Sequence, residues 1–284
     1  MATHPALTPG RAAVITGAAS GIGLAVAHSL AELGMNLLLA DIDGAALEQA
    51  AEQITGNTGR PVTIRTRRAD VSRADDIATL CDDAYDTWGE VAFLMNNAGV
   101  EGGGALSGGL AAWHRIIDTN LWGVVHGVQA FAARMGAQGN AAAIVNTGSK
   151  QGITCPPGDT AYNVSKAGIK VVTEALAHDL RQMRGNQVTA HLLIPGATFT
   201  GFSRAHGVVE KPAGAWTAEQ VAGFMLAGMA AGDFYILCPD NDVTRATDER
   251  RIAWAAGDII HNRPPLSRWH PDHAAAFAAF LKQE

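Results

Sequence analysis

Tyr162 and Lys166 stand four residues apart in the stretch AYNVSKAGIK, residues 161–170, whose apolar spacing predicts a half-buried helix. Residues at i and i+4 of a helix lie one above the other, so the phenol and the ammonium would face the same space. A tyrosine can exchange a proton with an alcohol or ketone oxygen if nearby positive charge lowers its pKa from about 10. An isolated YxxxK is more often an amphipathic surface pair, so the rest of the chain has to decide between the two.

A glycine-rich stretch near the N-terminus has the composition of a phosphate-binding turn. TGAASGIG, residues 16–23, follows an apolar run and precedes a helical pattern. Gly17, Gly21 and Gly23 would let the main chain turn tightly and approach a pyrophosphate, which a helix N-terminus attracts. The spacing is GxxxGxG, and an ordinary turn between a strand and a helix is the alternative interpretation.

Asp41 ends the next apolar run. An acidic residue about 20 residues beyond a glycine turn can accept hydrogen bonds from the adenosine ribose and repel a 2′-phosphate, which favours NAD over NADP. Asp43 is better explained as an acid in the first turn of the following helix.

The elements that would position these residues are seven apolar runs that alternate with helical patterns. They predict strands at residues 12–16, 36–40, 62–66, 91–95, 142–146, 188–194 and 234–238. Parallel strands need crossovers, and the crossovers are right-handed, so we predict an α/β fold: a doubly wound, Rossmann-like, mostly parallel seven-stranded sheet with helices on both faces.

No linker or internal repeat divides the chain, which indicates a single domain. We expect residues 1–238 to form a dinucleotide-binding and catalytic domain, and residues 239–284 to be a C-terminal extension of it. The apolar side chains of this extension, Trp254 and Trp269 among them, predict that it docks as a substrate cover or a subunit contact. Pro264 and Pro265 would hold it extended.

Composition excludes several classes of protein. A chain of 284 residues with 48% hydrophobic content can bury a sizeable core, and a formal charge of -6 argues against a nucleic-acid partner. The three cysteines are widely spaced and lack metal-ligand spacing, which indicates a reducing compartment and no metal. No leader or uninterrupted membrane-spanning run is evident, so we expect a soluble, cytoplasmic protein without a membrane partner.

Six ordered motifs resemble those of classical short-chain dehydrogenases/reductases. They are TGAASGIG, NNAG at 96–99, Asn120, Ser149, YNVSK at 162–166 and PGATFT at 195–200, and the resemblance extends from residue 11 to about 238. It implies that Tyr162 is the catalytic acid/base, that Lys166 also binds the nicotinamide ribose, that Ser149 holds the substrate oxygen and that Asn120 supports a water relay. One departure is Gly148, which stands where the family usually has the first of two serines.

The resemblance also assigns residues to the cofactor and the substrate. The cofactor residues would be Gly17, Ser20, Gly21, Ile22, Gly23, Asp41, Asp70, Val71, Asn97, Gly99, Tyr162, Lys166, Pro195, Gly196, Thr198 and Thr200. Without the resemblance, Asp70 would be a helix cap, and Asn97 should in any case brace the sheet. The substrate residues would be Ser149, Tyr162, Phe199, Phe202 and Trp216, although the aromatic ones could equally be interior packing.

The sequence thus predicts an NAD-dependent oxidoreductase that transfers a hydride between nicotinamide and a secondary alcohol or ketone, with a largely apolar or aromatic substrate. One alternative is an NADPH-dependent oxoacyl-type reductase, but neither GAASGIG nor ADIDGA carries a basic residue. The other is a non-catalytic dinucleotide-binding scaffold. We also expect a homo-oligomer, either a dimer or a tetramer, built on the helical segments 110–136 and 159–185.

Overall fold

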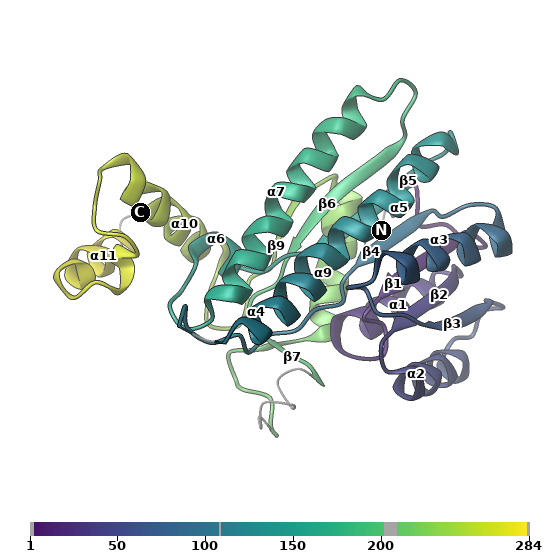
Figure 1. The fold of residues 1–284 in the computed structure, drawn as a ribbon, viewed down its shortest axis with the longest axis horizontal. Helices are drawn as coiled ribbons and strands as arrows, with labels where there is room; N and C mark the ends of the chain where they lie inside the picture. Colours follow the sequence, from purple (N-terminus) through teal and green to yellow (C-terminus); the bar gives the residue numbers. More distant parts are fainter. Residues whose placement is uncertain (1–2, 108, 202–208, 283–284) are drawn as a thin grey trace.

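A seven-stranded parallel sheet lies at the centre of the computed structural model, which describes residues 3–107, 109–201 and 209–282 (Figure 1). Its strands are β1 (Ala12–Thr16), β2 (Asn36–Asp41), β3 (Ile64–Arg68), β4 (Phe93–Asn96), β5 (Ala142–Thr147), β6 (Val188–Ile194) and β9 (Tyr235–Leu237). Their order is β3-β2-β1-β4-β5-β6-β9. The predicted Rossmann-like sheet is therefore confirmed.

Strands β3 and β4 begin two residues later than the apolar runs suggested. At β3, the Thr63 amide donates to the side-chain Oδ1 of Asn36 at 2.9 Å, so the regular ladder starts only after it. Every residue of β1 and β5 is buried. Strands covered on both faces read as continuous apolar runs, which is why the sequence marks them well.

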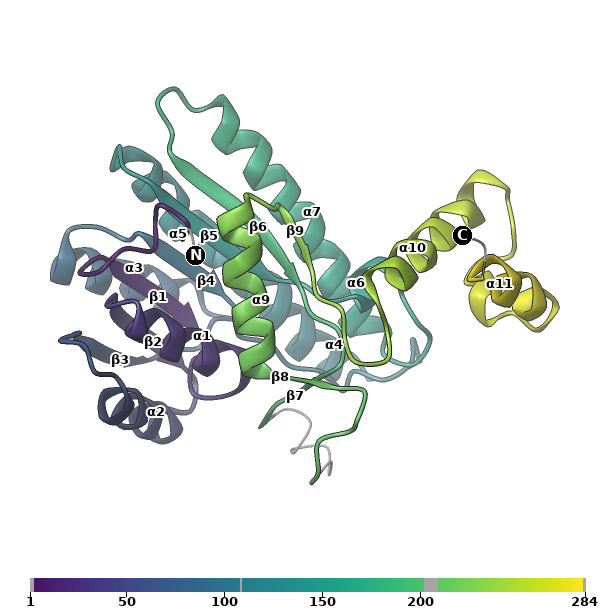
Figure 2. The same ribbon diagram turned by 180° about the vertical axis from the view of Figure 1, so that it is seen from behind.

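Helices cover both faces of the sheet (Figures 1 and 2). One face packs against α1 (Gly21–Glu32), α2 (Gly44–Asn57) and α9 (Ala218–Ala231). The other packs against α3 (Ala74–Trp88), α5 (Gly123–Ala137) and α7 (Thr160–Gln182). The chain runs outward from β1 to β3 and then crosses to β4 on the other side of β1, so the carboxyl ends of β1 and β4 border the crevice in which such folds bind ligands.

Short elements lie at the carboxyl edge of the sheet. Helix α4 (Leu110–Ile116) continues through a π-helical turn, Ile117–Trp122, into α5, and α6 (Gln151–Thr154) follows β5. The two-residue strands β7 (Thr198–Phe199) and β8 (Trp216–Thr217) pair in parallel. Two residues are too few to produce a periodic pattern, so the sequence did not predict this ladder.

The C-terminal extension, called the C-terminal arm below (residues 239–282), is helical. It contains α10 (Arg245–Ile260), the 3₁₀ turns Ser267–Trp269 and Pro271–His273, and α11 (Ala274–Phe280). Thr244 caps α10 by accepting from the Thr247 amide, and Trp254 packs against Phe277 and Phe280. The expectation of an extended segment was wrong, because these aromatic contacts fold the arm back on itself, and residues around Pro264 and Pro265 form a turn between α10 and the 3₁₀ turns.

The arm leaves the domain beside α6, and its helices extend away from the sheet in both views (Figures 1 and 2). The far end of α10 is exposed, with Ile259 at 87% of its accessible surface. Among the helices that the structure describes, none is long and apolar enough to cross a membrane.

Candidate active site

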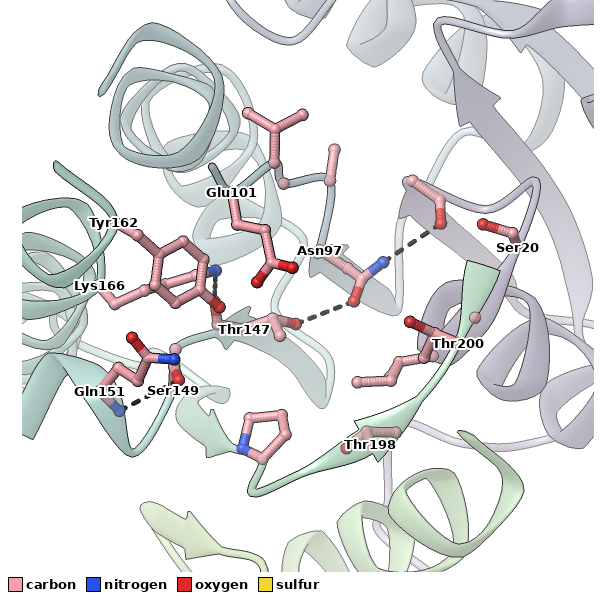
Figure 3. A pocket seen from close by; sticks show the side chains of 18 of the residues that line it. Ser20, Asn97, Glu101, Thr147, Ser149, Gln151, Tyr162, Lys166, Thr198 and Thr200 are labelled. Atoms are coloured by element: carbon pink, nitrogen blue, oxygen red, sulfur yellow. Dashed lines mark hydrogen bonds between the residues drawn. The ribbon is translucent and has the colours of Figure 1, made fainter. Parts of the chain in front are cut away.

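A cleft of about 900 Å³ opens at the carboxyl edge of the sheet. The glycine turn after β1, the ends of β2, β3, β4 and β5, the start of α7 and the segments around β7 and β8 all line it. Figure 3 shows Tyr162, Lys166, Ser149 and Gln151 on one side of it and Ser20, Thr198 and Thr200 on the other. This is the position and the size expected of a ligand site in a doubly wound fold.

The glycine turn forms a cradle that side chains would fill. Gly17 and Gly21 have positive φ angles of 65° and 57°. A Cβ atom on Gly23 would lie 2.2 Å from the Gly17 carbonyl oxygen. Ser20 is the N-cap of α1 but makes no capping hydrogen bond within the described part of the chain. The first-turn amides of α1 therefore lie at the cleft without a side-chain cap, which fits a bound pyrophosphate.

Asp41 lines the cleft at the end of β2. Its Oδ2 accepts a hydrogen bond from the Ala19 amide at 3.1 Å, which ties the carboxylate to the glycine turn. Asp43 is the N-cap of α2 and accepts from the Ala46 amide, so it has the helix-start role expected of it. Arg68 pairs with Asp41 in the β2–β3 register and donates to the Ile42 carbonyl at 3.1 Å. The proximity of Arg68 to Asp41 could not be predicted from the sequence, because the two residues lie on different strands.

Asn97 braces three strands. Its Nδ2 donates to the carbonyls of Thr16 and Gly17 at 3.1 and 3.2 Å, and its Oδ1 accepts from Thr147 Oγ1 at 3.3 Å. Figure 3 shows the Asn97 side chain between β4 and the end of β5, with a dashed line that joins it to Thr147. The expected structural role of Asn97 is confirmed, and its side chain also lines the cleft.

Asp70 and Val71 line the cleft after β3, and Gly99 lines it after β4. The Asp70 carboxylate accepts from the amide and hydroxyl of Ser72 at 2.9 and 2.7 Å, which forms a tight local turn. It is not a helix cap, because α3 begins later, with Arg73 at its N-cap.

Helix α7 brings Tyr162 and Lys166 to the same side of the cleft, as their spacing predicts. Asp159 caps the helix by accepting from the Tyr162 amide at 3.3 Å. Lys166 is buried, donates to the Thr147 carbonyl at 2.8 Å and lies 5.5 Å from the centre of the Tyr162 ring. Ser149 follows β5 and accepts from the Gln151 amide at 3.1 Å.

Burial raises the pKa of Tyr162 to about 12, even though part of its side chain is exposed to the cleft. A hydrogen bond with Ser149 acts in the opposite direction, and the charges of Glu101 and Asp159 raise the pKa further. Burial lowers the pKa of Lys166 to about 8. In the protein without its cofactor the pKa of Tyr162 is therefore raised, because desolvation disfavours the phenolate. The lowering expected from Lys166 together with a positively charged nicotinamide ring stays a prediction.

Asn120 lies beneath the cleft and is fully buried in the π-helical turn. Its Oδ1 accepts from the Val100 amide at 2.7 Å, while its Nδ2 donates to the Val100 carbonyl at 2.8 Å and to Ser165 Oγ at 3.1 Å. It is not among the residues that line the cleft. In this structure it holds the segment that carries Glu101, and π-helical turns are frequent at functional sites.

The segment after β6 supplies the wall opposite Tyr162. Pro195, Gly196, Thr198 and Thr200 all line the cleft, as the motif implied. The side chain of Thr200 packs on the glycine turn, since a Cβ atom on Gly21 would lie 3.1 Å from its Cβ.

Two of the aromatic residues assigned to the substrate lie outside the cleft lining. Phe199 and Trp216 are not among the lining residues, and Trp216 packs on the core and on Phe224, with ring centres 5.6 Å apart. Interior packing, the alternative weighed for these aromatics, therefore describes Trp216. Phe202 lies outside the described residues.

Sequence reasoning missed the polar residues that line the substrate side of the cleft. Glu101, Lys150, Gln151 and Asp242 lie there, and Figure 3 shows the Glu101 carboxylate facing the cleft beside Tyr162. Each follows a strand or lies in a turn and has no periodic or spaced signal, so only the fold could bring them together.

The short chain dehydrogenase family profile matches residues 11–208. The chain is 33% identical over 271 residues to 1-deoxy-11-beta-hydroxypentalenate dehydrogenase of Streptomyces exfoliatus, which covers 91% of this chain and 94% of the relative. A short-chain dehydrogenase/reductase structure from Burkholderia phymatum, in complex with NAD, is 35% identical with a TM-score of 0.81, covering 90% of this chain and 96% of the other.

An alcohol dehydrogenase structure from Thermococcus sibiricus, complexed with 5-hydroxy-NADP, is 25% identical with a TM-score of 0.69. That match covers 76% of this chain and 89% of the other.

Proposed function

Because the chain belongs to the short-chain dehydrogenase/reductase family, we propose that it is an NAD-dependent enzyme acting on a secondary alcohol or ketone. The observation that carries the proposal is the convergence of Ser149, Tyr162 and Lys166 on a cleft whose other end carries Asp41. A scaffold protein would have no need of a hydroxyl, a phenol and an ammonium aimed at one space.

In the reduction direction, Tyr162 donates its phenolic proton to the carbonyl oxygen while Ser149 donates a hydrogen bond to the same oxygen. The raised pKa of Tyr162 keeps the phenol protonated and ready for this step. When bound, the nicotinamide supplies the hydride to the carbonyl carbon in reduction and accepts it in oxidation. Lys166, fixed on the Thr147 carbonyl, presents its ammonium for the ribose hydroxyls.

Asp41 supports NAD as the cofactor. Its carboxylate is fixed by the Ala19 amide and lines the cleft, where it would accept hydrogen bonds from the adenosine ribose and repel a 2′-phosphate. Use of NADP is the second candidate, favoured by Arg68 beside Ile42, and the solved relatives include one with NAD and one with an NADP derivative. Asp41 outweighs Arg68 because it lines the cleft and Arg68 does not.

The substrate would enter between Tyr162 and the segment 212–215. Pro212 and Ala215 line the cleft and would suit the apolar or aromatic body of a substrate, while Glu101 and Gln151 line it near Tyr162. The Streptomyces exfoliatus relative is named as the dehydrogenase of a hydroxy compound, which agrees with an alcohol as the reacting group.

A homo-oligomer in the cytoplasm remains part of the proposal. The helices expected to form the contact carry exposed apolar side chains, with Trp122 at 49% exposure and Val171 at 62%. Light scattering at micromolar concentration should give a dimer or a tetramer, and a monomer would contradict this part of the proposal.

A thermal-shift measurement with NADH and NADPH, followed by turnover assays on cyclic and aromatic ketones and secondary alcohols, tests the main proposal. We expect a larger shift with NADH, since a ligand bound only to the folded state stabilises it. The absence of a shift with either nucleotide would overturn it.

A further inference from the structure

A buried group of charges ties the C-terminal arm to the candidate active site. Lys150 directly follows Ser149, and its ammonium lies 2.5 Å from Asp248 Oδ2 and 3.2 Å from Asp240 Oδ2. The three side chains are only 17%, 6% and 7% exposed. Both carboxylates belong to the arm, whereas the lysine belongs to the turn after β5, so the contact joins two segments far apart in the chain.

The ion pair packs on a third segment of the cleft. A Cβ atom on Gly196 would lie 2.6 Å from Asp240 Oδ2 and 2.8 Å from Lys150 Nζ. The Lys150 amide also donates to the Pro195 carbonyl at 3.3 Å. The arm therefore holds residues 149–155, called the Ser149 turn below, against the turn at Pro195 and Gly196. Residues of both turns line the cleft.

The same part of the arm also contacts the segment at Ala213 and Gly214, across the cleft from the Ser149 turn. The Asn241 amide donates to the Gly214 carbonyl at 3.0 Å, and its Nδ2 donates to the Ala213 carbonyl at 2.7 Å. Asp242 lines the cleft directly. Residues 240–242 thus bridge the Ser149 side and the segment that leads into β8.

A displacement of the Ser149 turn would also displace the part of α7 that carries Lys166. A Cβ atom on Gly152 would lie 2.4 Å from the main-chain carbon of Lys166, so α6 rests directly on the α7 backbone at that residue. Packed interiors transmit such displacements because they contain few voids. The geometry of Ser149 relative to Tyr162 and Lys166 accordingly depends on where Lys150 is held.

We propose that Lys150, Asp240 and Asp248 are positioning residues, through which the C-terminal arm holds the Ser149 hydroxyl in register with Tyr162. A buried ion pair adds little net stability because desolvation offsets its attraction, but it fixes geometry. The arm would then be needed for turnover although its helices lie outside the cleft. The catalytic consequence rests on the proposed function, whereas the structural coupling does not.

The test compares Lys150→Met, Asp248→Asn and Lys150→Arg with wild type. Lys170→Met is the matched control, because it removes a lysine from a more exposed ion pair, with Glu174, and both of these residues lie on α7. Hydrogen exchange at the amides of Gly152, Ile153 and Cys155, which bond within the Ser149 turn, reports on the turn without any substrate. NADH binding, kcat and KM are measured on the same preparations.

We expect Lys150→Met and Asp248→Asn to speed exchange in the turn and to lower kcat at least about tenfold, because displacements of the order of 1 Å can cost that much or more. NADH affinity should change less than about threefold if the arm acts on Ser149 and not on the cofactor cradle. Lys150→Arg should recover part of kcat, and Lys170→Met should match wild type in every readout.

Unchanged exchange in both Lys150→Met and Asp248→Asn would overturn the coupling, with or without a known substrate. A loss of kcat with unchanged exchange would also overturn it, since Lys150 would then act by touching the substrate. If Lys150→Met does not fold, Asp248→Asn, which retains the Asp240 partner, decides alone. A wild-type enzyme without turnover on any substrate would count against the proposed function, while the exchange comparison would still decide the coupling.

Discussion

The cleft is lined mainly by main-chain atoms at one end and by side chains at the other. The end nearest β1 is made of main chain, with Gly17, Gly21 and Gly23 forming a cradle and Asp41 as its charged group. The end nearest α7 is made of side chains, with Lys166 buried and Tyr162 partly buried. Main-chain amides do not titrate, whereas the phenol and the ammonium do. Substitutions at the end nearest β1 should therefore change cofactor binding, through shape and charge. Substitutions at the end nearest α7 should change the catalytic rate and its dependence on pH.

The largest effect on turnover is expected from the loss of the phenolic oxygen of Tyr162, which exchanges the proton with the substrate. Tyr162→Phe should lower turnover at least about 100-fold, the lower range for a positioned acid/base. The ring still fills its place, so NADH should stabilise the variant and wild type alike. Steady-state kinetics and a thermal shift with NADH check this. Near-normal turnover would contradict the role of the phenol.

Gly23→Ala should weaken cofactor binding at the end of the cleft nearest β1, by changing the shape of the glycine cradle and no charge. The added Cβ would lie 2.2 Å from the Gly17 carbonyl oxygen, so the turn must open. We expect a lower melting temperature and the loss of the NADH-induced shift at every pH.

Gly223→Ala is the matched control, because a Cβ there meets no atom within 4 Å. Gly223 lies inside α9, where alanine is favoured over glycine by about 1 kcal/mol, so this variant should be at least as stable as wild type. NADH binding by Gly23→Ala equal to that of the control would show that the cradle tolerates a side chain.

Asp41→Ser should change cofactor choice and leave the chemistry alone. Removing the carboxylate ends the repulsion of a 2′-phosphate, and Arg68 lies near enough to attract it, so the NAD-to-NADP ratio of kcat/KM should fall about tenfold. The ratio should recover in part when Arg68→Ala is added. A wild-type enzyme that prefers NADP would reverse the assignment of Asp41.

The smallest effect is expected in the pH profile of Glu101→Gln. The charge of Glu101 raises the pKa of Tyr162, so the neutral amide should lower that pKa. Alcohol oxidation requires the phenolate, and its rate rises with pH through this pKa. The rising limb should therefore move toward lower pH by less than about one pH unit. Glu219→Gln, on the exposed first turn of α9, is the control and should leave the profile unchanged.

The sequence by itself determined the framework of this protein. The central strands could be predicted because both faces of the sheet are covered there, so these strands are apolar runs. The edge strand β3, with the sequence IRTRR and no fully buried residue, gives a weaker pattern. Tyr162 and Lys166 could be paired because helical spacing alone brings them to one side. The glycine cradle and Asp41 could be located because the nucleotide-binding turn is a local structure, contained within one strand, one turn and one helix.

Only the tertiary structure decided what surrounds those residues. Strand register places Arg68 opposite Asp41, and a loop after β4 brings the charge of Glu101 close enough to act on Tyr162. Lys150 pairs with two carboxylates of an arm that begins about 90 residues further along the chain. Trp216 likewise packs on the core and on Phe224 of α9, a contact between two elements that its own sequence position does not reveal. The direction of the Tyr162 pKa could not be predicted because it depends on burial, and burial is set by contacts between elements that spacing along the chain does not encode.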